Sequence, residues 1–188
     1  AVAEGERVAS LEGPLGMILS GERTAMNFLC HLSGIATLTS RFVARVEGTG
    51  VRMLDTRKTT PGLRYLEKMA VFHGGGNNHR ADLSSYVLVK ENHIAASGGL
   101  DEVIGKLGDR IGECEIEVTS IGQLRSLEES PPGRVMLDNF SPGLIRDAVA
   151  ILSSWERRPE IEVSGGITLD NVADYAVEGV DFISTGSI

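Results

Sequence analysis

The sequence MLDTRKTTPG, at residues 53–62, leads a short apolar run directly into two adjacent cations, Arg57 and Lys58. Pro61 and Gly62 then indicate a turn and the start of a helix. Arg57 can donate two parallel hydrogen bonds to a carboxylate or a phosphate, and Lys58 adds a positive charge on a flexible side chain. We interpret the stretch as a strand that presents cations to an anionic ligand, although a solvated surface turn would show the same pattern.

The same order of apolar run, polar residues and helical pattern recurs along the chain. The apolar runs cover residues 51–54, 86–89, 115–118, 134–137, 160–163 and 181–183, and the helical patterns cover 62–72, 99–109, 120–130, 141–154 and 168–178. This alternation predicts an α/β fold with a parallel sheet. Polar residues follow all six runs, which favours a (β/α) barrel over an open doubly wound sheet, because the latter gathers its ligands at one switch point. We therefore expect an incomplete barrel of six or seven parallel strands.

Two different patterns precede the first of these strands. Residues 1–20 hold several glycines and Pro14, and they predict a hairpin and linker that end a truncated N-terminal α+β domain. Residues 21–48 show a helical period, with a break expected at Ser33-Gly34. Arg23 would then lie in the first turn of the helix, where a cation opposes the helix dipole. This placement hints at an outside anion, although a pair within the helix or at the surface is the simpler explanation for a single arginine. We assign residues 21–188 to the barrel domain and expect its C-terminus to be truncated.

The composition narrows the possible classes of function. The chain has 188 residues, 41% of them hydrophobic, which is enough for a substantial core. No apolar run has the length of a membrane span, and a net charge of −8 argues against nonspecific nucleic-acid binding. The two cysteines, Cys30 and Cys114, form no zinc-binding pattern. We expect a cytoplasmic protein that binds neither membranes nor nucleic acids, and any anionic ligand must meet locally concentrated cations.

Two glycine-containing loops follow the last two predicted strands. They are Ser164-Gly165-Gly166 and Thr185-Gly186-Ser187. Glycine lets backbone N–H groups approach an anion, and a helix starting after Thr168 would point its N-terminus toward that anion. Barrel enzymes commonly hold a phosphate in the loops of their last two strands. We interpret the pair as a phosphate site, although either loop alone could be a simple tight turn.

Two acids end neighbouring strands in the middle of the chain. Glu117 and Asp138 lie at the carboxyl ends of their strands, and Glu115 shares a face with Glu117 because side chains alternate along a strand. The two acids could ligate Mg²⁺, which takes one or two carboxylates and completes its shell with water and substrate phosphates. They could equally form salt bridges with Lys90 or Arg57.

With these residues assembled, the chain resembles the quinolinate phosphoribosyltransferase family from about residue 21 to residue 188. The motifs that carry the resemblance are residues 22–27, 33–37 and 55–59, Gly74-Gly75-Gly76 with Asn78-His79-Arg80, Lys90 with Asn92-His93, residues 137–140 and residues 164–167. The family couples quinolinate to phosphoribosyl pyrophosphate with Mg²⁺. It releases pyrophosphate and carbon dioxide and forms nicotinate mononucleotide for NAD synthesis. The resemblance implies the same substrates, reaction and metal for this chain.

The resemblance also implies roles for single residues. Arg57, His79, Arg80 and Lys90 would line the quinolinate site, and Arg23 would enter the neighbouring subunit's site in a homodimer. Lys58 and Lys90 would meet the phosphoribosyl donor, Glu117 and Asp138 its ribose hydroxyls and metal, and the loops with Ser164, Gly165, Gly166, Thr185 and Gly186 its 5′-phosphate. Lys90, Glu117 and Asp138 are the expected catalytic residues.

Some positions depart from the family's pattern, and other functions stay open. Asp82, Ser84-Ser85 and Glu91 are unusual, which affects local loop geometry more than chemistry. A paralogue associated with molybdate-transport operons is one alternative, against which the intact residues 90–93 argue. The others are a Schiff-base aldolase that uses Lys90 and an inactive phosphate-binding or dimerisation module.

Overall fold

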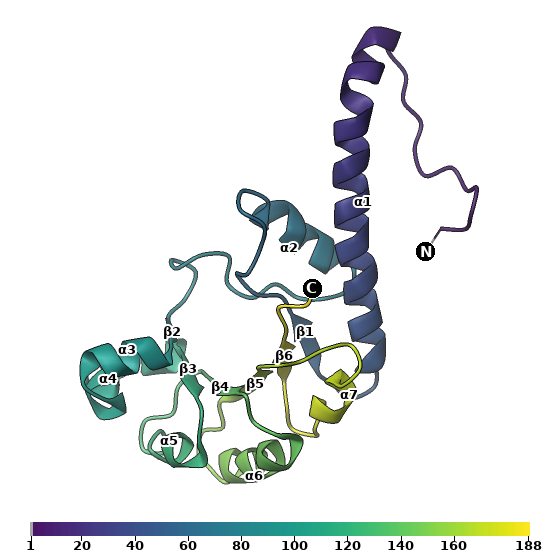
Figure 1. Cartoon of the computed structure of the whole chain (residues 1–188). Coiled ribbons are helices and arrows are strands. Elements are labelled where there is room, and N and C mark those ends of the chain that lie inside the picture. The colour runs from purple at the N-terminus through teal and green to yellow at the C-terminus, as the bar shows by residue number, and fades with distance from the viewer. Residues whose placement is uncertain (1) are drawn as a thin grey trace.

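Six parallel strands form the centre of the protein, for which a computed structural model describes residues 2–188 (Figure 1). The strands are β1 (Arg52–Leu54), β2 (Leu88–Val89), β3 (Glu115–Val118), β4 (Arg134–Asp138), β5 (Glu160–Ser164) and β6 (Phe182–Ser184). Their order in the sheet is β1-β6-β5-β4-β3-β2, and all neighbours are parallel. The predicted strands and their parallel arrangement are confirmed.

The sheet bends into an arc whose two edges do not pair with each other. β1 and β2 are these edges in the described part of the chain. An isolated parallel bridge between Leu54 and Asn77 extends the β1 edge, and residues 78–87 then lead to β2. Figure 1 shows the strands nearly end-on, with α4, α5 and α6 along the outer side of the arc. The prediction of an incomplete (β/α) barrel is confirmed.

Most of the connecting helices lie where the sequence predicts them. They are α2 (Arg64–His73), α4 (Leu100–Leu107), α5 (Ile121–Arg125) and α6 (Pro142–Ser153), and a 3₁₀ helix, η1 (Gly108–Glu113), follows α4. Helix α3 (Glu91–Ser97), which begins directly after Lys90, was not predicted.

The last helix is much shorter than expected. Helix α7 covers only Val172–Tyr175, so the predicted helix over residues 168–178 is wrong for most of its length. The Asn171 side chain accepts a hydrogen bond from the Thr168 backbone N–H (2.8 Å) and donates one to the Gly166 carbonyl (3.1 Å). These bonds hold residues 166–171 as a turn, so no helix begins at Thr168.

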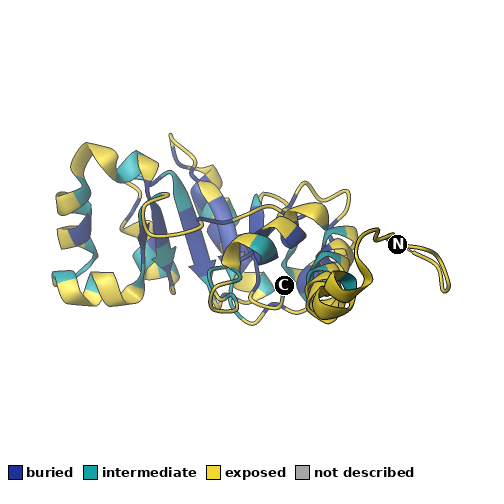
Figure 2. Ribbon diagram, turned by 90° about the horizontal axis from the view of Figure 1, so that it is seen from above, coloured by how far each residue is buried: buried dark blue, intermediate teal, exposed yellow. Residues whose placement is uncertain are grey.

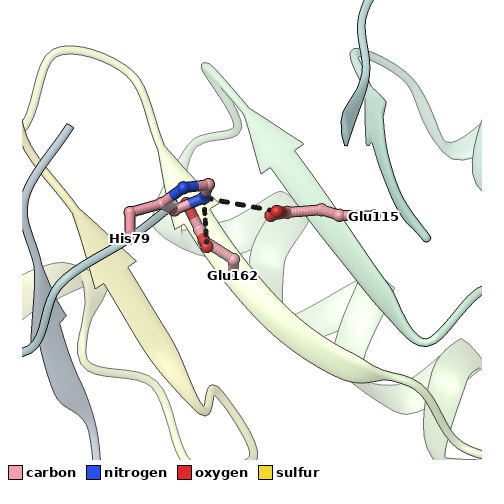
Figure 3. Close-up of side chains that lie close together, drawn as sticks. All are labelled: His79, Glu115 and Glu162. Carbon is pink, nitrogen blue, oxygen red and sulfur yellow. Dashed lines mark ion pairs between the residues drawn. The ribbon is translucent and has the colours of Figure 1, made fainter. Parts of the chain in front are cut away.

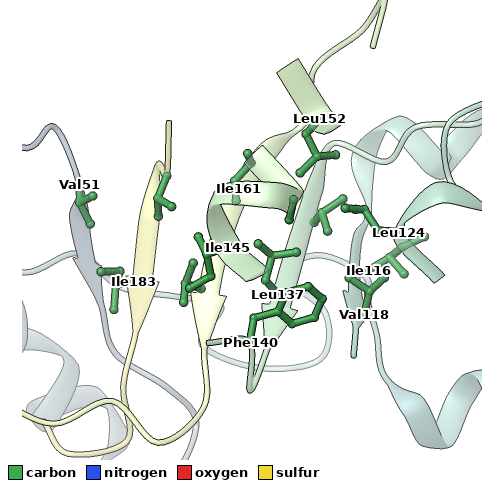
Figure 4. Close-up of a cluster of buried hydrophobic side chains, with 14 of the residues drawn as sticks. Val51, Ile116, Val118, Leu124, Leu137, Phe140, Ile145, Leu152, Ile161 and Ile183 are labelled. Carbon is green, nitrogen blue, oxygen red and sulfur yellow. The ribbon is translucent and has the colours of Figure 1, made fainter. Parts of the chain in front are cut away.

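The two faces of the sheet have opposite character because side chains alternate along each strand. Apolar side chains on the outer face, among them Ile116, Leu137 and Ile161, are fully buried against α5 and α6. Figure 4 shows this core between strands and helices, with Ile145 and Leu152 contributed by α6. Burying such side chains contributes about 1.5–3 kcal/mol each, so the outer layer is the main source of stability.

The inner face of the arc is largely polar. In the parallel register, Glu115 of β3 lies beside Arg134 of β4, and Asp138 of β4 lies beside Ser164 of β5. Glu162 lies on the same face and is fully buried. A buried carboxylate is costly unless it is paired, so this face is built for polar chemistry and not for packing.

Helix α1 (Leu15–Arg45) is a single helix of 31 residues and differs from the sequence prediction in three ways. The hairpin expected in residues 1–20 is wrong, because no strand occurs in residues 2–14 and the helix already begins at Leu15. The break at Ser33-Gly34 is wrong too, since one interior glycine costs only about 1 kcal/mol. Arg23 consequently lies in the third turn, where the helix dipole no longer acts on it, so the predicted conflict with the dipole is absent.

The C-terminal half of α1 packs on the barrel, whereas its N-terminal half is exposed. Phe42 is buried near β1, and Figure 2 shows the opposite end of α1 in the colour of exposed residues. Where α2 ends against α1, a Cβ on Gly74 would lie 2.5 Å from the Ala36 carbonyl oxygen. The glycine-rich stretch 74–76 is therefore a close-packed turn against α1. Within residues 2–188, no helix has both the length and the apolar character needed to cross a membrane.

Candidate active site at the carboxyl ends of the strands

A pocket opens at the carboxyl ends of the strands and contains most of the predicted cations. It has about 570 Å³ of space not filled by protein atoms. Its lining comprises Asp55, Thr56, Arg57, Lys58, His79, Arg80, Leu88, Lys90, Met136, Glu162, Ser164 and Ser184. The structure thus brings together six of the predicted site residues from segments far apart in the sequence.

A buried ion pair fixes the loop that carries His79 and Arg80. Lys68 of α2 and Asp55 at the end of β1 are 6% and 2% exposed, and Lys68 Nζ lies 2.5 Å from Asp55 Oδ1. Asp55 also accepts hydrogen bonds from the His79 backbone N–H (2.8 Å) and from Asn78 Nδ2 (2.7 Å), and Lys68 donates to the His79 carbonyl (2.9 Å). The pair therefore determines where His79 and Arg80 emerge.

His79 lies between two buried carboxylates, those of Glu115 and Glu162 (Figure 3), and both His79 and Glu162 line the pocket. Its Nε2 is 3.2 Å from Glu115 Oε2 and 3.4 Å from Glu162 Oε2. The Arg80 backbone N–H lies 2.9 Å from Nδ1, the Tyr86 hydroxyl lies 3.1 Å from Nδ1 and 2.9 Å from Nε2, and Nε2 is the ring nitrogen that faces the acids. Burial alone would lower the pKa of His79, but hydrogen bonds to and charges of Glu115 and Glu162 outweigh burial and raise that pKa to about 9.

The two carboxylates of this cluster have different surroundings. Tyr86 donates a hydrogen bond to Glu115 Oε2 (2.7 Å), and Arg134 Nη1 donates one to Glu162 Oε2 (3.2 Å). Burial raises the pKa of Glu162, and the negative charge of Glu115 raises it further, whereas the hydrogen bond with His79 lowers it. The pKa of Glu115 is lowered, since its bonds with His79 and Tyr86 outweigh its burial.

The cluster of His79, Glu115 and Glu162 has one potential metal ligand atom from each residue within 4.8 Å of the others. The ring nitrogen lies 3.2 Å from the Glu115 oxygen and 3.4 Å from the Glu162 oxygen, close enough for direct ion pairs. A shared proton on Nε2 already supplies the bridge between the ring and the acids.

Three cations of the pocket lack an anionic partner. Within residues 2–188, the side chains of Arg57 and Lys58 form no ion pair or hydrogen bond, and Arg80 donates only to the Tyr86 carbonyl (3.3 Å). Burial lowers the pKa of Arg80, and the positive charge of Arg57, which lines the same pocket, lowers it further. Like charges held together in a partly buried pocket favour a ligand with more than one negative charge.

The salt bridge that the sequence left as an alternative for the two acids is present for one of them. Lys90 Nζ pairs with Glu117 Oε2 at the pocket's edge. Burial raises the pKa of Asp138, and so does the nearby charge of Glu117, while Lys90 and Lys58 lower it. Two neighbouring carboxylates of this kind have the hard oxygen ligands that Mg²⁺ prefers, and a cation would relieve their repulsion. The residues present therefore fit Mg²⁺.

The two glycine loops lie next to one another at the pocket. Gly165 and Gly166 have φ angles of 99° and 62°, and a Cβ on Gly165 would lie 2.7 Å from the Asn139 backbone nitrogen, so glycine is required there. The Thr185 hydroxyl donates to the Ile167 carbonyl (2.7 Å) and ties the loops together. A Cβ on Gly186 would be 3.5 Å from Lys58 Cδ, which places that lysine at the second loop.

This arrangement corrects one part of the predicted phosphate site. The short α7 begins only at Val172, so no helix N-terminus at Thr168 contributes. Anion binding here would rest on the loop N–H groups and Lys58. Arg23 lies on the exposed part of α1 and outside the pocket of its own chain.

Sequence reasoning missed several polar residues of the pocket. Glu162 was not singled out, although the runs Glu115-Ile116-Glu117 and Glu160-Ile161-Glu162 both show carboxylates at the two-residue strand period. Reading that period on every strand would have placed Glu162 beside Glu115. Lys68 gave no such signal, because its partner lies 13 residues away on another element.

The unusual residues at positions 82, 84 and 85 form a self-contained turn. Asp82 Oδ1 accepts hydrogen bonds from the backbone N–H and hydroxyl of Ser84 (2.9 and 2.8 Å) and of Ser85 (3.1 Å each). These bonds lower the pKa of Asp82. The departure from the family pattern is thus a different way of closing the exposed loop before Tyr86.

Sequence models of the quinolinate phosphoribosyl transferase family match the chain in two parts. The N-terminal domain matches residues 1–33 and the C-terminal domain residues 35–188. The two matches meet in the middle of α1, whereas the sequence placed the domain division after residue 20.

Known relatives of this chain share one named activity. The probable carboxylating nicotinate-nucleotide pyrophosphorylase of Methanocaldococcus jannaschii is 43% identical over 190 residues, which is 96% of this chain and 67% of that protein. The enzyme of that name from Mycobacterium leprae is 40% identical over 98% of this chain and 66% of its own length. The crystal structure of the nicotinate-nucleotide pyrophosphorylase of Ehrlichia chaffeensis matches with a TM-score of 0.83 at 40% identity, covering 90% of this chain and 61% of that one.

This chain accordingly spans about two thirds of the length of its curated relatives. The family models cover nearly all of its residues, and the structural match includes the open six-stranded barrel. The chain belongs to the quinolinate phosphoribosyl transferase family.

Proposed function

We propose that this protein transfers the phosphoribosyl group of phosphoribosyl pyrophosphate to quinolinate, with loss of pyrophosphate and carbon dioxide, and so forms nicotinate mononucleotide for NAD synthesis. The observation that carries the proposal is a group of cations, Arg57, Lys58 and Arg80, that have no anionic partner in the described part of a chain whose net charge is −8. Quinolinate is a dicarboxylate and phosphoribosyl pyrophosphate is a polyphosphate, so the two substrates together would supply the negative charge that these cations lack.

The geometry supports a division of the pocket between the two substrates. Arg57, Arg80 and His79 surround its floor, where an arginine can bind a carboxylate through two parallel hydrogen bonds. Lys58 lies beside Gly186, and Ser164 leads into Gly165 and Gly166. Quinolinate would therefore occupy the floor, with the 5′-phosphate of the donor at the two loops.

Lys90 lines the pocket and pairs with Glu117, and both lie near Asp138, so these three residues would serve the transfer itself. The quinolinate nitrogen attacks the anomeric carbon of the ribose while pyrophosphate leaves, and positive charge develops on the sugar. The carboxylates of Glu117 and Asp138 would stabilise that charge, and Lys90 and Lys58 the charge of the leaving group. Glu117 and Asp138 would also hold Mg²⁺, whose charge offsets that of the departing pyrophosphate.

We further propose that the protein acts as a homodimer in which Arg23 completes the partner's pocket. Arg23 is exposed and remote from its own pocket, and the exposed half of α1 that carries it bears apolar side chains such as Met26 and Leu29, 46% and 43% exposed. A second copy would bury these residues. The expected cytoplasmic location rests on the cysteine pattern, and Cys30 and Cys114 are both free thiols.

The test is formation of nicotinate mononucleotide by the full-length protein from quinolinate, phosphoribosyl pyrophosphate and Mg²⁺. Lys90→Ala should reduce the rate by roughly 10²-fold or more, since it removes a charge aimed at the reacting groups. Lys106→Ala is the matched control, because Lys106 is an exposed lysine at the end of α4, and it should leave the rate unchanged. Absence of product with folded wild-type protein would overturn the proposal.

A further inference from the structure

The carboxyl group of Glu162 has a feature that its place in a packed barrel does not explain. Glu162 is 0% exposed, yet its Oε1 has no hydrogen-bond partner within residues 2–188. The hydroxyl of Ser184, 2% exposed, lies close enough to Glu162 to lower the pKa of that carboxyl group, but it forms no hydrogen bond of normal geometry within residues 2–188. Both residues line the pocket floor. Leaving a buried carboxyl oxygen without a partner destabilises the fold, so the arrangement favours a role toward what enters the pocket.

The other oxygen of the same carboxyl group is fully engaged. Glu162 Oε2 accepts a hydrogen bond from Arg134 and lies 3.4 Å from His79 Nε2. One side of the group therefore contacts a proton-bearing ring while the other is free at the pocket. A carboxyl group placed this way can pass a proton from His79 to a molecule bound above it.

The proposed reaction requires such a proton. When the carboxylate on ring carbon C2 leaves as carbon dioxide, the carbon–carbon bond breaks and its electron pair stays on C2, beside the positively charged nitrogen. A new C2–H bond must then form. Arg57, Lys58, Arg80 and Lys90 are the cations of the pocket, and arginine in particular does not give up its proton in proteins.

Resting on the proposed function, we propose that Glu162 is the acid that protonates C2 when carbon dioxide leaves, and that His79 and Glu115 are positioning residues that restore its proton. The O–H bond of Glu162 breaks as the C2–H bond forms, which leaves a carboxylate. The His79 imidazolium gives its Nε2 proton to Oε2, becomes a neutral imidazole, and regains a proton from solvent through the pocket. No oxidant or further reactant is needed.

The charges around Glu162 agree with this assignment. Glu115 on β3 disfavours the ionised form, while the Nε2–H of His79, Arg134 on β4 and the Ser184 hydroxyl on β6 favour it. Burial and the charge of Glu115 outweigh these groups and raise the pKa of Glu162, which favours the protonated acid. After it donates, a second charge beside ionised Glu115 promotes rapid reprotonation.

The experiment follows pyrophosphate and carbon dioxide in the same rapid-quench turnover of the full-length enzyme. Wild type should release the two in equal amounts without a lag. Glu162→Gln keeps the shape of the side chain but cannot donate in this way, so it should release pyrophosphate while carbon dioxide lags by at least tenfold and undecarboxylated quinolinate mononucleotide accumulates. Glu160→Gln is the matched control, since Glu160 is an exposed carboxylate on the same strand and also pairs with Arg134, and it should behave as wild type.

If Glu162 has only a structural role, Glu162→Gln should change the KM for quinolinate while pyrophosphate and carbon dioxide are still released at equal rates. That result would overturn the inference. If Glu162→Gln does not fold, the wild-type enzyme decides: the ratio of early carbon dioxide to pyrophosphate should fall as the pH rises and Glu162 loses its proton. A ratio of one at every pH would contradict the assignment. Failure of the proposed function itself would look different, because wild type would then release no pyrophosphate.

Discussion

Replacing Lys68 with methionine should destabilise the protein more than any exposed charge change. The substitution keeps the bulk of the side chain but removes the cation 2.5 Å from Asp55 Oδ1, in a place where both side chains are under 10% exposed. Removing one member of a buried ion pair leaves an uncompensated charge and costs about 3–5 kcal/mol. Asp55 keeps two neutral donors, the His79 N–H and Asn78 Nδ2, so we expect about 3 kcal/mol for Lys68→Met.

Asp55→Leu should cost more, about 5 kcal/mol, because it orphans the ammonium group of Lys68 and the His79 N–H together. In the double variant Lys68→Met/Asp55→Leu neither charge remains, so its loss of stability should be about 2 kcal/mol smaller than the sum of the two single-variant losses. The measurement is the free energy of unfolding in urea at pH 7. Arg110→Ala is the control, since its ion pair with Glu113 is exposed and contributes less than about 1 kcal/mol.

Additive losses, or a loss below about 1 kcal/mol for Lys68→Met, would refute the view that this pair anchors the pocket. The variant has a second expected effect. Since the pair holds the His79 backbone from both sides, Lys68→Met should raise the KM for quinolinate more than it lowers kcat.

Three further predictions concern packing, pH and assembly. Gly74→Ala should lower the free energy of unfolding by about 1–3 kcal/mol, because its Cβ would meet α1, whereas Gly16→Ala, with nothing within 4 Å, should be neutral or stabilising in the same urea titration. The pKa of His79 is raised from 6.5 to about 9 in the folded state, so its contribution to the free energy of unfolding is complete below pH 6.5 and is lost as the pH rises through 9. Wild type should therefore lose stability over that pH range relative to His79→Gln. Parallel stability curves for the two proteins would contradict this. Inactive Arg23→Ala and Lys90→Ala chains, mixed and allowed to exchange subunits, should regain part of the activity if Arg23 acts in the partner's pocket, whereas unchanged inactivity of verified heterodimers would exclude that arrangement.

The strand pattern was predictable because each parallel strand carries a local signal. The apolar runs end in polar residues, and the polar residues mark the carboxyl ends that form the pocket. The positions of Arg57, Lys58 and Lys90, which follow β1 and β2, are those that this topology predicts. His79 and Arg80 lie in the loop after α2, and the contacts of Lys68 and Asp55 are needed to place them.

The remaining features depend on contacts between distant elements. Helix α1 passes through Gly34 because its C-terminal half packs on α2 and the β1 edge, and this packing is not visible in the local sequence. The short α7 reflects the Asn171 side chain competing for the backbone of residues 166–168. The salt bridge between Lys68 and Asp55 likewise requires that α2 be placed against β1 before it can be recognised.

The most direct test of the central claim compares two acceptors for the same enzyme. With phosphoribosyl pyrophosphate and Mg²⁺, full-length protein should convert quinolinate to nicotinate mononucleotide, and it should use nicotinate, which has a single carboxylate, far less well. The pocket holds Arg57 and Arg80, which have no anionic partner within residues 2–188. Nicotinate would leave one of these guanidinium groups unpaired, and a site built to hydrogen-bond a ligand group rejects a ligand that lacks that group. Equal use of nicotinate, or no product from quinolinate, would contradict the account.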